Sequence, residues 1–154
     1  MAFLGAMAIS FSIIESMIPK PLPWMRIGLA NAITLYAFTV LKPYEVLPVV
    51  LSRVVATSIL LGTLLSVSFF LSLSGALSSF IIMYLLYKYM HRFFSIVGVS
   101  VAGAVTSNAA QLTVLNILFI NSRISYFFLP FILIFALAGG ILSGLFARFL
   151  TENI

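Results

Sequence analysis

The chain has 154 residues, of which 63% are hydrophobic and only 7% are charged. A soluble globular domain carries roughly 25% charged residues, so the composition excludes a soluble enzyme, a disordered chain and a nucleic-acid-binding domain. The net charge of +5 does not change this, because the eight Lys and Arg residues are scattered singly and cannot follow a phosphate backbone. There is no cysteine, which excludes disulfides and thiolate chemistry. The sequence predicts an integral membrane protein in contact with lipid, with a single transmembrane domain over residues 1–154.

Six apolar segments predict an all-α bundle of six transmembrane helices, because a spanning helix needs about 20 mostly apolar residues. In chain order, the expected helices cover residues 1–18, 28–41, 45–70, 75–90, 97–120 and 126–150. The first segment lacks the basic start and the small-residue cleavage site of a signal peptide, so it is predicted to be a true helix. Prolines end the first two segments, and Pro48 is expected in the first turn of the third. Ser72-Leu-Ser-Gly75 is predicted to form the turn before the fourth helix.

An even number of spans places both termini on one side of the membrane. That side would carry Lys42, Lys88, Arg92 and Arg148, and the opposite side Lys20, Arg26 and Arg123. Cytoplasmic loops carry an excess of Lys and Arg. The charge distribution therefore favours a multi-pass protein of the cell membrane with both termini in the cytoplasm.

Polar residues inside spans are costly, and they usually face a cavity or another helix. Glu15, near the outer end of the first helix, is either a snorkelling or ion-paired carboxylate or a site carboxylate. Asn108 and Gln111 are three residues apart and share a helix face, so their amides are expected to bond a neighbouring helix or a ligand. Together with Asn31 in the second segment, they favour a binding site. Arg53, two turns inside the third helix, is predicted to have a structural role.

The loop that follows the first helix contains Trp24 and Arg26. Trp24 is either an anchor at the membrane interface or a lid over a substrate. Arg26, with Lys20, is either a headgroup anchor or an attraction for an anionic or amphipathic ligand. His91 has no second His or carboxylate at ligand spacing, so no metal site and no cofactor are predicted.

Small residues recur at four-residue spacing, which lets helices approach closely. The three stripes are Ala2 and Ala6; Ala102, Thr106 and Ala110; and Ala136, Gly140 and Gly144. The second and third are predicted to pack within this chain. The first fits a contact with a partner protein as well as internal packing, and the partner contact is our prediction.

Motifs along most of the chain resemble one known family. Glu15-Ser-Met-Ile-Pro19 and Gly28-Leu-Ala-Asn31 are similar to pieces of the small membrane family labelled heptaprenyl diphosphate synthase component I, also called the Gx transporter family. Further along, that family usually reads His-Asn-x-Gly-Gln. This chain reads Ser107-Asn-Ala-Ala-Gln111, which keeps both amides and lacks the His and the Gly.

The family in turn resembles the S components of energy-coupling factor (ECF) transporters. These six-helix proteins bind one small molecule from outside and dock on a T subunit that carries two ATPases. The resemblance implies cytoplasmic termini, a gating loop after the first helix, and a docking face of the A-x-x-x-A type, which Ala2 and Ala6 match. An Asp-rich Mg²⁺–diphosphate motif is impossible here, because the chain contains no Asp.

The leading hypothesis is a substrate-binding, non-enzymatic membrane subunit of an ECF-type uptake transporter. Its site would be lined by Glu15, Asn31, Asn108 and Gln111, with Trp24 and Arg26 above. The alternative is a non-transporting membrane partner of prenyl diphosphate or quinone synthesis. An intramembrane enzyme is the weakest reading, because one Glu and one Arg at different depths make a poor catalytic pair.

Overall fold

The computed structural model describes residues 2–18, 28–90, 93–118 and 124–153, and within these ranges the chain is helical and contains no strand. Six helices follow one another along the chain, which confirms the predicted all-α fold. They are α1 (Ala2–Met17), α2 (Leu29–Val40), α3 (Pro43–Leu60), α4 (Val67–Met90), α5 (Ile96–Leu118) and α6 (Ile124–Asn153).

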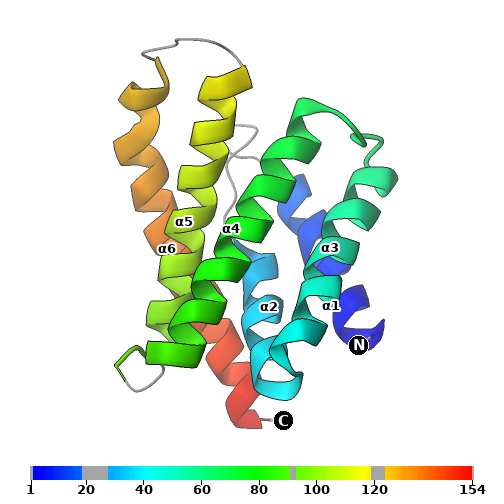
Figure 1. Ribbon diagram of the computed structural model, residues 1–154, viewed down its shortest axis with the longest axis vertical. Helices are drawn as coiled ribbons and strands as arrows, with labels where there is room; N and C mark the ends of the chain where they lie inside the picture. The colour runs from blue at the N-terminus through cyan, green and yellow to red at the C-terminus, as the bar shows by residue number, and fades with distance from the viewer. Residues whose placement is uncertain (1, 19–27, 91–92, 119–123, 154) are drawn as a thin grey trace.

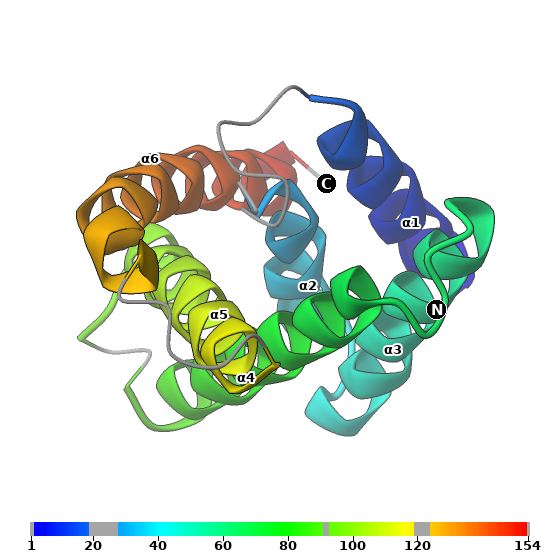
Figure 2. The same cartoon turned by 90° about the horizontal axis from the view of Figure 1, so that it is seen from above.

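The helices run alternately up and down, so both ends of the chain lie at the same end of the bundle (Figure 1). Helix α2 lies in the middle, and the other five helices all pack against it (Figure 2). Around it, neighbouring contacts run in the order α1, α3, α4, α5, α6. This ring is open between α6 and α1: no Cα pair of their described residues lies within 8 Å, although the rings of Phe11 and Phe146 are 5.4 Å apart.

The boundaries of α3 differ from those predicted. Helix α3 begins at Pro43, where the missing N–H costs nothing, and the Glu45 carboxylate accepts a hydrogen bond from the Lys42 N–H at 3.1 Å. Pro48 therefore lies in the second turn and not the first. The helix ends at Leu60, about ten residues before the predicted end. Gly62 adopts φ 65°, and Thr63 N–H bonds back to the Ser58 carbonyl at 2.9 Å, the arrangement of a Schellman C-cap.

The predicted turn at Ser72-Leu-Ser-Gly75 is wrong, because these residues lie inside α4. Ser74 Oγ donates to the Leu71 carbonyl at 3.0 Å and Ser78 Oγ to the Ser74 carbonyl at 2.7 Å. Where water is scarce, a serine hydroxyl satisfied by its own helix is compatible with a continuous helix. The small side chains of this segment serve close packing instead of a turn.

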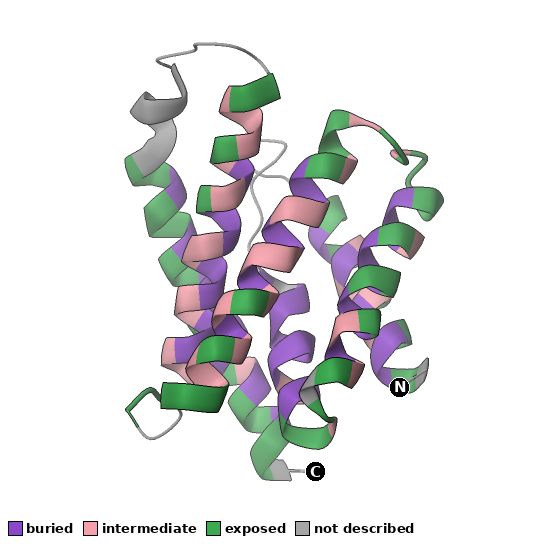
Figure 3. Ribbon diagram, in the orientation of Figure 1, coloured by how far each residue is buried: buried purple, intermediate pink, exposed green. Residues whose placement is uncertain are grey.

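Three helical segments are long and apolar enough to cross a membrane: Val67–Met90, Ile96–Leu118 and Pro130–Glu152. Helices α1 and α2 are apolar but shorter. Most of α2 is buried, whereas α3 and α6 turn large apolar side chains outward (Figure 3). These exposed residues include Leu51, Val55, Ile59, Phe131, Ile134, Leu142 and Leu145. An exterior of this kind is typical of a surface that meets lipid.

Helices α5 and α6 approach closely through glycines on α6, as the third small-residue stripe predicts. A Cβ added at Gly140 or Gly144 would lie 2.7 Å from the Cα of Val101 or Val97, respectively. A buried hydrogen bond of 2.8 Å joins the hydroxyls of Ser100 and Ser143 at the same interface. The stripe of Ala102, Thr106 and Ala110 on α5 is half-buried, and α5 meets the glycines of α6 through Val97, Ser100, Val101 and Ala104.

Candidate functional site

The central helix α2 begins about halfway along the bundle, and its beginning is held by a carboxylate from α1. Glu15 Oε1 accepts a hydrogen bond of 2.9 Å from the Gly28 N–H. Glu15 is only 5% exposed, so it is not a snorkelling side chain. Gly28 adopts φ 90°, which favours glycine. A negative charge at this point also complements the positive N-terminal end of the α2 dipole.

The beginning of α2 faces the middle of α5. A Cβ at Gly28 would lie 3.5 Å from Asn31 Nδ2 and 3.9 Å from the Cβ of Ala104. One turn further along α5, Asn108 Nδ2 donates to the Ala104 carbonyl at 3.0 Å. Asn31 and Asn108 are both buried, at 5% and 3% exposure. The structure therefore places Glu15 and Asn31 at the beginning of α2, which faces the part of α5 that carries Asn108.

Gln111 continues this polar series along α5, beyond the beginning of α2. It is 2% exposed, and its Nε2 donates to Ser107 Oγ at 3.1 Å. The amide lies against Gly75 of α4, where an added Cβ would be 2.5 Å from Gln111 Nε2 and 2.7 Å from Ser107 Oγ. From Ala104 to Gln111 the polar series rises about 10 Å at 1.5 Å per residue. It extends away from the chain termini, into the half of the bundle that α2 does not occupy (Figure 1).

Several predicted residues lie outside what the structure describes. Trp24 and Arg26 belong to residues 19–27, so their predicted roles as lid and ligand attraction are not located. The side chain of Ala2 is also outside the described part, whereas Ala6 is exposed on the outer face of α1. No group of three or more His, Cys, Asp or Glu that could hold a metal occurs within the described residues.

Sequence reasoning missed some contributors to this interior. The sequence predicts a turn at Gly75, whereas this glycine allows a close approach to the amide of Gln111. Gly28, which the sequence indicates only as part of a motif, supplies the N–H that Glu15 binds. The hydroxyls of Ser12 on α1 and Thr57 on α3 are buried and have no hydrogen-bond partner among the described residues. Arg53, which the sequence does single out, is buried as well, at 2% exposure. A signal for Gly75 existed, because glycine inside an apolar segment often marks a helix contact.

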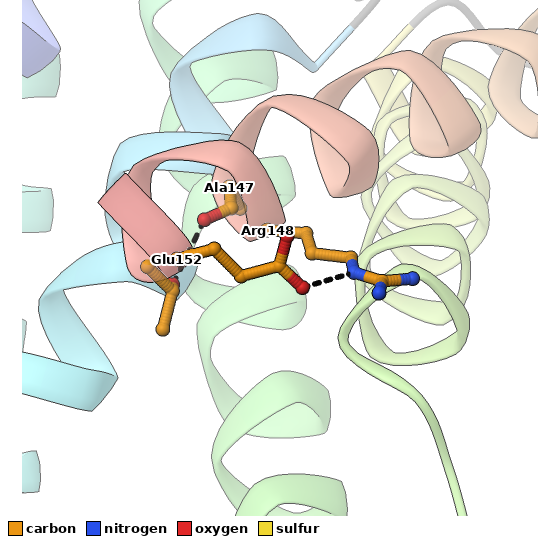
Figure 4. A network of polar contacts seen from close by, with 4 residues as sticks. Ala147, Arg148 and Glu152 are labelled. Atoms are coloured by element: carbon orange, nitrogen blue, oxygen red, sulfur yellow. Dashed lines mark hydrogen bonds and ion pairs between the residues drawn. The ribbon is translucent and has the colours of Figure 1, made fainter. Parts of the chain in front are cut away.

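Charged groups gather at the other end of the bundle, where the chain termini lie. Arg148 Nε donates to Glu152 Oε1 at 2.7 Å across one turn of α6, on side chains that are 59% and 58% exposed (Figure 4). Lys88, at the end of α4, donates to the Tyr84 hydroxyl at 3.2 Å and lies over the ring of Tyr89. Such exposed pairs contribute little to stability. The exposed charged side chains of the described residues thus lie at the end of the bundle that holds the termini.

An apolar exterior, three helices long enough to cross a bilayer, and buried amides around a short central helix define a helical bundle of the membrane-protein class. The sequence profile described as heptaprenyl diphosphate synthase component I matches residues 4–150. The chain belongs to this family, as the motifs at Glu15 and Gly28 indicate. No curated protein and no solved structure matches the chain.

Proposed function

We propose that this chain is the substrate-binding membrane subunit, similar to an S component, of an ECF-type uptake transporter. In this proposal, all six helices lie in the cell membrane, including the short α1 and α2, and both termini are cytoplasmic. The chain binds a small molecule from the outer side and relies on a T subunit and two ATPases for energy. It binds and does not catalyse, and it uses no cofactor.

One observation carries the proposal: buried polar side chains from α1, α2 and α5 converge where α2 begins, in the middle of the bundle. Asn31, Asn108 and Gln111 are each at most 5% exposed, and they carry the buried amides of an interior that also holds Glu15, Arg53 and several hydroxyls. Buried polar groups are costly in a membrane protein and commonly mark a substrate path. In this proposal, the ligand reaches these amides from the end of the bundle opposite the termini, beyond the beginning of α2.

The proposed orientation is supported by the charges at the two ends of the bundle. Lys42, Lys88 and Arg148 lie at the end that holds the termini, where the sequence predicts four cations against three at the opposite end. The positive-inside rule assigns such an end to the cytoplasm. In this orientation, Gln111 lies on the outer side of the beginning of α2, the side from which a nutrient would arrive.

Within this mechanism the side chains have separate tasks. Glu15 fixes the beginning of α2 through the Gly28 N–H, which keeps Asn31 in place beside α5. Asn108 and Gln111 orient the polar part of the ligand. Release to the cytoplasm requires work by partner ATPases, because this chain has no phosphate-binding Gly-rich loop. The exposed Ala6 face of α1 is the proposed contact with the T subunit.

The test begins with the ligand and ends with transport. Small molecules that co-purify with the chain are identified by mass spectrometry. The amount that co-purifies with Asn108→Leu is then compared with the amount that co-purifies with Asn116→Leu, which removes a half-buried amide elsewhere on α5. The enriched molecule is then offered to liposomes that contain the chain with or without a T subunit and ATPases. Uptake is expected only with the complete set and ATP. Uptake by the chain alone would contradict the proposal.

A second function is supported by the family description itself. The description "component I" of heptaprenyl diphosphate synthase suggests that the chain is a membrane partner of a soluble prenyl synthase and transports nothing. Co-purification with such a synthase, together with no thermal stabilisation of the chain by any small molecule, would favour this function over transport.

A further inference from the structure

The buried amide of Gln111 indicates the chemistry of the ligand, and this inference rests on the proposed function. Its Nε2 is bonded to Ser107, but its Oε1 is buried and has no hydrogen-bond partner within the described part of the chain. An unsatisfied buried acceptor costs about 1–3 kcal/mol. Native proteins keep such a group where a ligand, an ion or a water completes it.

The surroundings of Gln111 fix which atom of the amide is available. At Gly75, the three atoms nearest to an added Cβ are Gln111 Nε2 at 2.5 Å, Ser107 Oγ at 2.7 Å and Gln111 Cδ at 3.1 Å. Oε1 is not among these three nearest atoms. The space beside Gly75 and the hydroxyl of Ser107 together hold the amide nitrogen. The amide oxygen is therefore the atom that remains to bind another molecule.

We propose that Gln111 Oε1 accepts a hydrogen bond from an uncharged O–H or N–H group at the polar head of the ligand. An uncharged head is favoured because α5 contains no charged residue. The nearest carboxylate in the polar series, Glu15, already bonds the Gly28 N–H. A neutral donor completes Oε1 without bringing an unpaired charge into the interior of the bundle, where such a charge is strongly disfavoured.

The chain offers a direct measurement, because Gln111 is its only glutamine. Protein labelled with a carbon isotope in the glutamine side-chain carbonyl gives one Cδ resonance, which reports the hydrogen bonding of Oε1. The purified chain in detergent micelles is titrated with three probes that share one alkyl tail: n-decanol, n-decyl methyl ether and n-decylammonium. The tail makes all three enter the micelle, and only the heads differ.

The expected result is a saturable shift of the Cδ resonance with n-decanol, a weaker response to n-decylammonium and none to the ether. Gly75→Ala, whose Cβ displaces the amide, should abolish the shift. Gly103→Ala is the matched control, because it adds a methyl between the same pair of helices at a point where the three nearest atoms all belong to Met83. Equal responses to n-decanol and the ether, a stronger response to n-decylammonium, or no response to any probe would each overturn the proposal. The last outcome would assign Oε1 to a structural water.

The inference and the proposed function fail separately. An unresponsive Gln111 in a chain that supports ATPase-dependent uptake removes the inference and leaves the transporter. A responsive Gln111 in a chain that supports no uptake with any partner set keeps the binding site and removes the transport function.

Discussion

Helix α5 meets α4 along one face and α6 along another, and both interfaces depend on glycine. At the α6 interface, the space left by Gly140 and Gly144 is filled by the backbone of α5 at Val101 and Val97. At the α4 interface, the space left by Gly75 and Gly103 is filled by the flexible ends of side chains, Gln111 and Met83. The α5–α6 interface is therefore filled by backbone atoms, which cannot move without the helix. The α4–α5 interface is filled by side-chain atoms, which can change rotamer.

The two interfaces also differ in how far the hydrogen bonds of their polar groups are satisfied. Ser143 Oγ donates to the Gly140 carbonyl at 3.2 Å, which uses its single proton, so Ser100 is the donor in the 2.8 Å bond between the two hydroxyls. This chain of bonds is complete. At the α4 interface, Gln111 keeps an acceptor without a partner among the described residues. We infer that α5 and α6 form the scaffold, and that the α4 side of α5 is where the molecule can adapt to a ligand.

The largest expected effect is a difference between two glycines. Gly140→Ala places a methyl 2.7 Å from the Val101 Cα, so α5 and α6 must move apart. The free energy of unfolding should therefore fall by about 2–3 kcal/mol. Gly103→Ala meets Met83, which can change rotamer, and should cost less than about 1 kcal/mol. Reversible unfolding in mixed detergent micelles measures both. Equal losses of stability would contradict the distinction between scaffold and adaptable interface.

The next effect tests how α2 is held in the centre. Glu15→Ala removes the acceptor of the Gly28 N–H and should lower the free energy of unfolding by about 1–3 kcal/mol, because a buried donor loses its partner. Glu15→Gln keeps an acceptor oxygen and should recover much of this loss. If both variants are as stable as the parent chain, the carboxylate does not fix the beginning of α2.

The number and type of helices could be predicted from the sequence, because the length of an apolar run and its prolines are local properties. The turn between α3 and α4 could not be predicted in the same way. Ser72-Leu-Ser-Gly75 has the composition of a turn, but Ser74 and Ser78 satisfy their hydroxyls within the helix. The actual end of α3 depends on one residue, Gly62, whose positive φ closes the C-cap.

The buried polar residues of the candidate site could be identified from the sequence, but the contacts that they make could not. The sequence indicates that Asn108 and Gln111 share a face, since their spacing fixes it. Spacing cannot indicate that Glu15 bonds a backbone N–H rather than a cation, or that Gly75 receives the amide of Gln111, because these contacts join segments far apart in the chain.

A smaller effect distinguishes the two serines of the scaffold interface. Ser143→Ala leaves the buried Ser100 without its acceptor and should cost about 1–2 kcal/mol. Ser100→Ala removes only a donor, since Ser143 still bonds the Gly140 carbonyl, and should cost about half as much. The double variant should be more stable than the sum of the two losses predicts, and a double-mutant cycle measures this coupling. Strict additivity would show that the hydroxyls do not act as a pair.

The smallest expected effect on stability is at Ala6. Its side chain is exposed on the outer face of α1, so Ala6→Trp should change the free energy of unfolding by less than about 0.5 kcal/mol. The same substitution should abolish assembly with a T subunit, because a docking helix gains from close approach only while its contact residues are small. Ala138→Trp, at an exposed alanine of α6, is the control and should leave assembly intact. Co-purification with the T subunit measures both. Intact assembly with Ala6→Trp would move the docking face away from α1, and a loss of the folded chain would show that the stripe packs internally.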